Sequence, residues 1–165
     1  MKRNLVVYRF YIIVLVLFNI GCDQISKKVV RNNVESRDYI ELIDDHFILT
    51  NVENTGAMLG FGAGFPPIVK IVLLQIVPIM VLMLLLYRVL TKKTIGTWLV
   101  VAFAFVIGGG IGNLIDRVAY GSVTDFFQIR LGIFKTGIFN MADVAVTSGI
   151  LLIFFLSLYS KKLNI

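Results

Sequence analysis

Four long apolar stretches dominate the chain, and each is long enough to cross a bilayer as a helix. A hydrocarbon core of about 30 Å needs roughly 20 apolar residues in helical form. None of the stretches alternates as a membrane β-strand would, and in lipid a helix satisfies its own backbone groups. The pattern predicts an α-helical integral membrane protein, a single domain over 1–165, with transmembrane helices at about 5–22, 68–90, 95–115 and 138–159.

Two longer connections join these helices on one side of the membrane, at about 23–67 and 116–137. Within the first, residues 39–43 and 46–52 have the composition of β-strands, and Asp44-Asp45 lies between them as a turn. A connection of this length is more than a simple turn. We therefore expect a small β-rich subdomain that lies on the membrane surface.

Lys and Arg residues predict the orientation of the helices. They flank the apolar stretches on the side opposite the long connections, where no acid accompanies them, and basic flanks of this kind favour the cytoplasm. We therefore expect both termini in the cytoplasm and both long connections outside it. Connection 23–67 also holds four basic residues, but seven acids offset them. The cytoplasmic flanks are expected to contain Lys2, Arg3, Arg88, Lys92, Lys93, Lys161 and Lys162.

Composition supports a membrane protein. Hydrophobic residues make up 58% of the chain and charged residues 16%, whereas a soluble domain has roughly 25% charged residues. These values exclude a disordered chain and disfavour a soluble globule. The net charge is +6, but the basic residues lie at the ends of apolar runs, so membrane lipid is the expected partner and nucleic acid is not. A single cysteine and a single histidine give no basis for a disulfide framework, a metal site or a cofactor.

The first apolar stretch also has features of a cleaved signal. Lys2 and Arg3 precede it, and Asn19-Ile20-Gly21-Cys22 is similar to a bacterial lipoprotein cleavage site. Three further apolar spans follow, and lipoproteins do not have these. We therefore expect an uncleaved first helix.

Acidic residues are the most informative candidates for chemistry. After Glu53 the chain contains only Asp116, Asp125 and Asp143, all in or beside predicted spans. Carboxylates in membrane segments usually mark a site or an ion path. Asp143 has no basic neighbour in sequence, which favours a functional role. Asp125 could equally be an ordinary loop acid.

The same tetrapeptide pattern surrounds two of these acids. Asn113 lies three residues before Asp116, and Asn140 lies three residues before Asp143, so each pair shares one helix face. An Asn amide can donate to a carboxylate and hold its orientation. Arg117 follows Asp116 directly, and a structural pair between them at a helix end is the favoured interpretation of Asp116.

Three other motifs allow structural or functional readings. Asp23 and Lys27 have the helical i, i+4 spacing of an ion pair, which also suits anchoring at the interface. Residues 54–57, Asn-Thr-Gly-Ala, form a candidate tight turn. The glycines of 108–112 lie inside an apolar helix and follow no strand, so close helix packing explains them better than dinucleotide binding does.

Two carboxylates at a membrane edge make aspartic proteolysis possible. Close carboxyl groups share one proton, so one can take a proton from water while the other protonates a carbonyl oxygen. A small proton-coupled transporter that uses Asp116, Asp125 and Asp143 as a relay is the alternative, and a non-catalytic membrane scaffold is a third. A transport path needs polar residues through the full depth of the membrane, and the acids here cluster on one side.

Five motifs in their order along the chain resemble the prolipoprotein signal peptidases, also called signal peptidase II. The resemblance covers nearly the whole chain, and the motifs are 23–27 (DQISK), 54–57 (NTGA), 112–117 (GNLIDR), 123–126 (VTDF) and 139–143 (FNMAD). It implies an aspartic endopeptidase of the bacterial cytoplasmic membrane. Such an enzyme cleaves just before a diacylglyceryl-modified cysteine and is inhibited by globomycin.

The resemblance also assigns roles to residues. It implies that Asp125 and Asp143 form the catalytic dyad, with no metal or cofactor, and we expect a monomer. One departure is visible: many members have Ala-Phe or Ala-Trp after the Gly-Ala of the second motif, where this chain has Met58-Leu59. Supporting or substrate-binding roles are implied for Asp23, Lys27, Asn54, Gly56, Asn113, Asp116, Arg117, Asn140 and Ala142.

Overall fold

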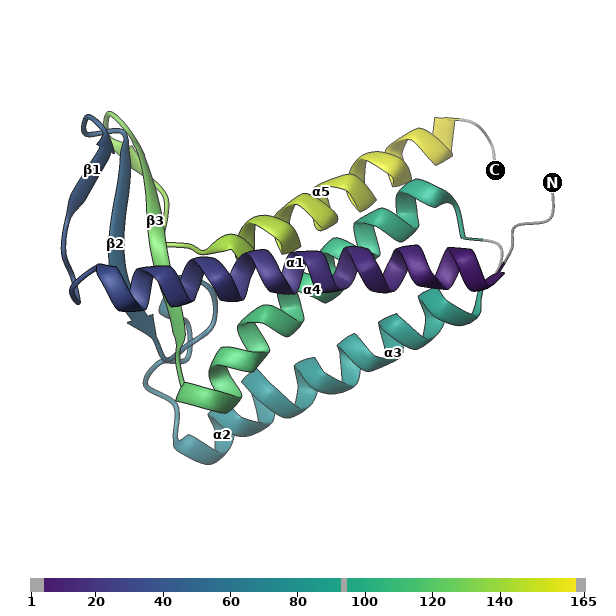
Figure 1. The fold of residues 1–165 in the computed structure, drawn as a ribbon, viewed down its shortest axis with the longest axis horizontal. Helices are drawn as coiled ribbons and strands as arrows, with labels where there is room; N and C mark the ends of the chain where they lie inside the picture. Colours follow the sequence, from purple (N-terminus) through teal and green to yellow (C-terminus); the bar gives the residue numbers. More distant parts are fainter. Residues whose placement is uncertain (1–4, 93–94, 163–165) are drawn as a thin grey trace.

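The computed structural model describes residues 5–92 and 95–162, which form a bundle of membrane-length helices with a sheet at one end (Figure 1). Four helical segments have the length and composition to cross a membrane, as the apolar stretches predict. The described helices are α1 (Leu5–Asn33), η1 (Met58–Gly60), α2 (Pro67–Ile71), the π-helical η2 (Val72–Ile76), α3 (Val77–Thr91), α4 (Thr97–Tyr120) and α5 (Met141–Lys162).

The first helix is longer than the apolar pattern predicts. It was expected to end at 22, but α1 continues to Asn33. No glycine or proline interrupts residues 23–33, and Asp23, Lys27 and Arg31 recur every four residues on one face. Because this polar face is satisfied by partners on α4, the helix continues beyond its apolar part.

Other helix boundaries differ from the predicted ones, and the causes are local. The third span was expected to end at 115, but α4 continues to Tyr120 and ends where Gly121 adopts φ 75°, a left-handed conformation that glycine tolerates. The fourth span was expected from 138, but α5 begins at Met141 because Asn140 caps it. The second span is observed as α2, η2 and α3, from Pro67 to Thr91.

Helix α4 packs against α1, α3 and α5, and its glycines allow the close approach. A Cβ atom on Gly108 would lie 2.6 Å from Asn19 Cβ, and one on Gly112 would lie 2.6 Å from Asp23 Oδ2. Neither position has room for a side chain. These contacts agree with the close helix packing that the sequence predicts for 108–112.

The sheet contains the two predicted strands and two more. Its antiparallel order is β1 (Ile40–Ile43), β2 (Phe47–Asn54), β3 (Val123–Leu131) and β4 (Phe134–Lys135). Strand β3 pairs with β2 although about seventy residues separate them in the chain, and this pairing places Val52 opposite Asp125. Strand β4 has no signal in the sequence.

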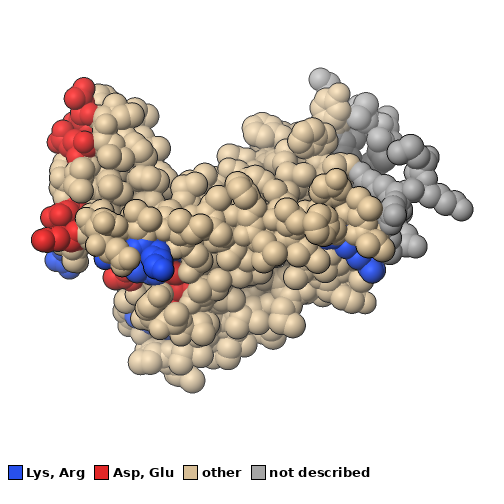
Figure 2. Space-filling model, viewed as in Figure 1, with Lys and Arg blue, Asp and Glu red and all other residues tan. Residues whose placement is uncertain are grey.

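Charged side chains gather near the ends of the helices. On the face shown in Figure 2, basic groups lie near both ends and a broad uncharged surface separates them. Large apolar side chains of the helices, such as Val6, Leu73, Met83 and Phe155, are exposed. This is the distribution expected where lipid surrounds the helices. Lys2, Arg3 and Lys93, which were used to predict orientation, lie outside the described residues.

Candidate active site

The carboxyl groups of Asp125 and Asp143 both bond one residue, Asn140. The Nδ2 of Asn140 donates to Asp125 Oδ1 at 2.6 Å, and its backbone N–H donates to Asp143 Oδ2 at 3.1 Å. Asp125 comes from β3 and Asp143 from the first turn of α5. The fold therefore brings together two acids that are eighteen residues apart in the chain.

Asn140 also caps α5. Its Oδ1 accepts from the backbone N–H of Asp143 at 3.0 Å, and Asp143 accepts in return from the backbone N–H of Asn140. This reciprocal arrangement is a capping box, which satisfies two amide groups that the helix start leaves free. These contacts are local in sequence, and they fix the position of Asp143 relative to the start of α5.

Asn113 on α4 connects this pair to a buried cation. Its Nδ2 donates to Asp143 Oδ1 at 2.8 Å, while its Oδ1 accepts from Asn140 Nδ2 at 3.1 Å and from Lys27 Nζ at 2.8 Å. Two donors on one oxygen and an acceptor on the nitrogen allow only one orientation of the amide. Asn113 therefore holds α4, α5 and α1 in register at the two acids.

Lys27 lies between two acids, and all three side chains are fully buried. Its Nζ is 2.8 Å from Asp23 Oδ2 and 3.2 Å from Asp116 Oδ2. Asp23 Oδ1 also accepts from the backbone N–H of Ala142 at 2.8 Å, which ties the start of α5 to α1. Because each buried charge has an opposite partner, the cluster avoids the large cost of an unpaired ion.

The predicted pair between Asp116 and Arg117 is wrong. Asp116 instead pairs with Lys27 and with Arg31, whose Nη2 lies 2.8 Å from Asp116 Oδ2. Consecutive residues of a helix point about 100° apart, so Arg117 faces away from Asp116.

Arg117 reaches the loop that precedes η1. Its Nη2 donates to the carbonyl oxygen of Gly56 at 3.1 Å, and its buried Nε has no hydrogen-bond partner among residues 5–92 and 95–162. A Cβ atom on Gly56 would lie 2.6 Å from the carbonyl oxygen of Phe61, so only glycine fits there.

Asn54 joins the same loop to Asp125. Its Nδ2 donates to Asp125 Oδ2 at 3.0 Å and to the Ala57 carbonyl at 3.1 Å, and its Oδ1 accepts from the Gly56 N–H at 2.9 Å. The predicted tight turn at 54–57 is therefore present. All eleven residues singled out from the sequence lie in one connected network of hydrogen bonds and ion pairs.

The surroundings of Asp125 favour its protonated form. Burial, and then the nearby charge of Asp143, raise the pKa of Asp125 from 3.8 to about 6, while donors from Asn54 and Asn140 oppose the rise. Only 4% of Asp125 is exposed. Two carboxyl groups bonded to one residue, one of them able to hold a proton near neutral pH, can act as a paired acid and base. No cluster of three or more potential metal ligands occurs among the described residues.

Several residues of the network were not predicted from the sequence. Gln24 donates to Asp116 Oδ1 at 3.0 Å, and Arg31 Nε donates to Thr124 Oγ1 at 2.6 Å. Thr124 Oγ1 in turn donates to Glu53 Oε1 at 2.7 Å. The spacing of Asp23, Lys27 and Arg31 could have indicated Arg31, but the contacts of Gln24, Thr124 and Glu53 depend on tertiary structure.

Comparisons with known proteins agree with this architecture. A family model described as Signal peptidase (SPase) II matches residues 13–159. A lipoprotein signal peptidase of Pelodictyon phaeoclathratiforme is 40% identical over 148 residues, which cover 82% of this chain and 82% of that protein. One from Enterococcus faecalis is 33% identical, with 98% of this chain and 94% of that protein covered.

A solved structure has the same fold. It is described as a bacterial membrane enzyme structure by the in meso method at 2.3 Å resolution, and it matches with a TM-score of 0.82 and 28% identity over 92% of this chain and 89% of that one. The four spans and the bacterial relatives identify a multi-pass bacterial membrane protein. The resemblance drawn from the five motifs is confirmed, and the chain belongs to the signal peptidase II family of aspartic-type hydrolases.

Proposed function

We propose that this chain removes signal peptides from diacylglyceryl-modified prolipoproteins, with Asp125 and Asp143 as the catalytic dyad. The observation that carries the proposal is the shared hydrogen-bond partner Asn140, which holds both carboxyl groups at one point. Family membership supports the reaction class. The raised pKa of Asp125 supports a division of roles between the two acids.

In the proposed mechanism Asp125 carries the shared proton and Asp143 is the base. Asp143 takes a proton from a water molecule as its oxygen attacks the scissile carbonyl carbon, and Asp125 protonates the carbonyl oxygen. The tetrahedral intermediate then collapses: Asp143 gives its proton to the leaving nitrogen, Asp125 takes back a hydroxyl proton, and the C–N bond breaks, which restores both acids. One water is consumed, and the products are the carboxylate of the signal peptide and the free amine of the lipidated cysteine.

The remaining network has positioning and binding roles in this proposal. Asn113 and Asn140 orient the acids, and the Asp23–Lys27–Asp116 cluster holds the helices that carry them. Asn54 and Gly56 shape the loop beside Asp125. The buried Nε of Arg117 has no hydrogen-bond partner among the described residues, so it can donate to the substrate backbone.

We also propose the membrane placement that the basic flanks predict, with both termini in the cytoplasm and the dyad near the extracytoplasmic face. A lipid-anchored substrate would then reach the site by diffusion in the membrane plane. Inhibition by globomycin and a monomeric state belong to the same proposal. The transporter alternative lacks support, because the buried acids of the described helices meet in one network at the sheet end.

A cleavage assay tests the proposal. Purified protein is mixed with a precursor lipoprotein that carries, or lacks, its diacylglyceryl group, and the size shift is followed on a gel. D125N and D143N are compared with D38N, a matched change of an exposed acid. We expect wild type and D38N to cleave only the lipidated precursor, and both dyad variants to be inactive although folded.

Two outcomes would contradict it. Activity in either folded dyad variant would remove that residue from the catalytic role. Failure of wild type to cleave a competent lipidated precursor would reject the peptidase assignment for this chain and reopen transport.

A further inference from the structure

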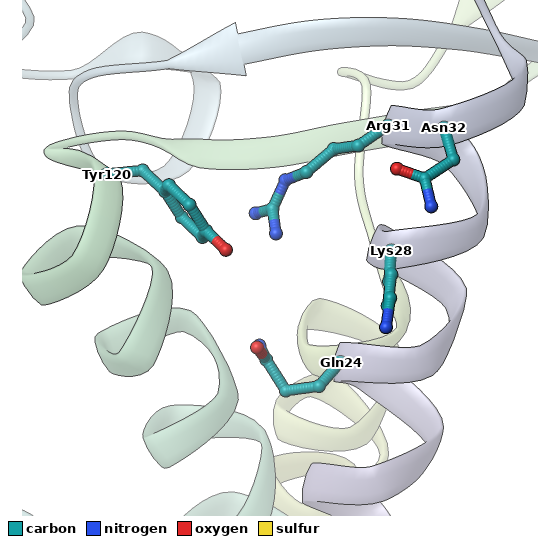
Figure 3. A pocket seen from close by; sticks show the side chains of 5 residues that line it. All are labelled: Gln24, Lys28, Arg31, Asn32 and Tyr120. Carbon is teal, nitrogen blue, oxygen red and sulfur yellow. The ribbon is translucent and has the colours of Figure 1, made fainter.

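A polar pocket lies between α1 and the end of α4, and two of its lining residues, Gln24 and Arg31, also contact Asp116. Its volume is about 390 Å³, within the roughly 300–1,000 Å³ typical of small-molecule sites. In Figure 3 the side chains of Arg31, Gln24 and Tyr120 point into the space between the two helices, and Lys28 runs along the edge of α1 beside it. Its lining residues are Gln24, Lys28, Arg31, Asn32 and Tyr120.

The pocket presents positive charge without an acid in its lining. Arg31 is held in place, because its Nε donates to Thr124, its Nη2 pairs with Asp116, and its guanidinium carbon lies 4.2 Å from the centroid of the Tyr120 ring. Lys28 is different: within the described part of the chain it forms no ion pair and no side-chain hydrogen bond, and it is exposed.

One cation in this region has no carboxylate partner. Lys27 and Arg31 pair with the buried carboxylates Asp23 and Asp116, and Glu53 accepts from Thr124 beside Arg31, whereas Lys28 forms no ion pair among the described residues. The partial negative charge at the C-terminal end of a helix falls off within a turn, so it acts at Arg31 and Asn32 in α1 and at Tyr120 in α4, whereas Lys28 lies more than a turn before the end of α1. The attraction for an anion in the pocket is therefore concentrated at Lys28.

The position of the pocket relative to the membrane indicates the source of such an anion. It lies where two spans end, and an exposed Tyr such as Tyr120 is typical of the headgroup level. Apolar side chains on the same two helices, namely Ile25, Val29, Ile115 and Val118, are 38–67% exposed and provide a surface for acyl chains. Asn32 and Gln24 add amides that can hydrogen-bond to phosphate or glycerol oxygens.

We propose that this pocket binds the phosphate headgroup of an anionic phospholipid, with Lys28 as the residue that selects for net negative charge. Arg31 and Tyr120 form the fixed wall against which the headgroup lies. A zwitterionic headgroup carries its own cation beside the phosphate, so Lys28 discriminates against it. The site is separate from the proposed dyad and does not depend on the proposed catalytic function.

Native mass spectrometry of the full chain in detergent tests this site. Dioleoylphosphatidylglycerol and dioleoylphosphatidylcholine are titrated in parallel, and inorganic phosphate is added as a competitor in a third arm. We expect one phosphatidylglycerol to bind about fivefold or more tightly than phosphatidylcholine, since a basic residue near an anionic lipid surface contributes about that factor. We expect inorganic phosphate not to displace it.

Variants of the pocket identify the residue responsible. K28Q is expected to remove most of the preference, and N32D, which adds an acid to the mouth, is expected to do the same. K135Q is the matched control, because Lys135 is an exposed lysine on β4, outside the pocket. Equal affinity of the wild type for both lipids, or a preference that persists in both K28Q and N32D, would overturn the proposal. Displacement of phosphatidylglycerol by inorganic phosphate would show that the pocket binds free phosphate, and it would overturn the assignment of a lipid as the ligand.

Discussion

Asn140 and Asp143 hold each other at the start of α5 through reciprocal hydrogen bonds of 3.0 and 3.1 Å. The same Asn140 side chain donates to Asp125 at 2.6 Å. A helix cap and the orientation of an acid pair are therefore carried by a single residue. The two tasks can be separated by substitution, because a cap needs only a side-chain acceptor, whereas Asp125 needs a donor with the reach of an amide.

N140S and N140A separate these tasks. Both variants lose the buried hydrogen bonds from Asn140 Nδ2 to Asp125 and Asn113, so both should be less stable than wild type. Serine is a good helix cap and alanine is not, so N140A should be about 1 kcal/mol less stable than N140S. Both remove the amide donor to Asp125, so kcat should fall roughly 10- to 100-fold in both, the range for a lost hydrogen bond to a charged group. Thermal unfolding in detergent and initial cleavage rates measure the two effects. Wild-type kcat in N140S would contradict a positioning role for the amide.

Removal of the buried cation should destabilise the protein strongly. K27M leaves Asp23 without its cation in a fully buried position, and breaking a buried pair in this way costs about 3–5 kcal/mol. The matched control is K28M, the same change one residue away on an exposed lysine. We expect a large drop in the unfolding temperature for K27M and little change for K28M. Similar unfolding temperatures for the two variants would show that the cluster contributes no stability.

Gly112 should not tolerate a methyl group. A Cβ atom there would lie 2.6 Å from Asp23 Oδ2 and 3.0 Å from Asp23 Cγ, so G112A must displace the carboxylate that binds Lys27 and the Ala142 amide. G21A is the control, because nothing lies within 4 Å of a Cβ atom on Gly21 in α1. We expect G112A to lower both thermal stability and cleavage rate, and G21A to leave both unchanged or to raise stability through better helix propensity. Equal stability and equal cleavage rate of G112A and G21A would argue against the close contact between Gly112 and Asp23.

The raised pKa of Asp125 predicts a pH dependence of stability. Between pH 3.8 and about 6 folded Asp125 keeps a proton that the unfolded chain has lost, so stability falls as pH rises through this window. A rise of this size corresponds to about 3 kcal/mol. D125N removes this loss, so its unfolding temperature relative to wild type should be higher at pH about 7.5 than at pH about 4.

D38N is the control for this pH experiment, since Asp38 is exposed. Its unfolding temperature relative to wild type should be the same at both pH values. A constant difference between D125N and wild type across the window would show that Asp125 does not hold a proton in the folded protein.

The sequence by itself determined the class of fold. Long apolar runs have no stable alternative to helices in lipid, so four spans followed from their length alone. Strands β1 and β2 and their Asp44-Asp45 turn could also be predicted, because their signals are local. The cap at Asn140 is local as well, since Asn140 and Asp143 lie three residues apart at the start of α5.

Only the tertiary structure decided which charges meet. The sequence placed Arg117 beside Asp116, but the helix turns the two side chains apart, and Asp116 finds Lys27 and Arg31 on a helix about ninety residues earlier. The continuation of α1 to Asn33 depends on those same partners, which no apolar pattern contains. The sequence alone did not distinguish Asp125 from an ordinary acidic residue of a loop. The pairing of β3 with β2 and the reach of Asn140 place it beside Asp143, because strand pairing and side-chain hydrogen bonds join residues by their positions in space rather than in the chain.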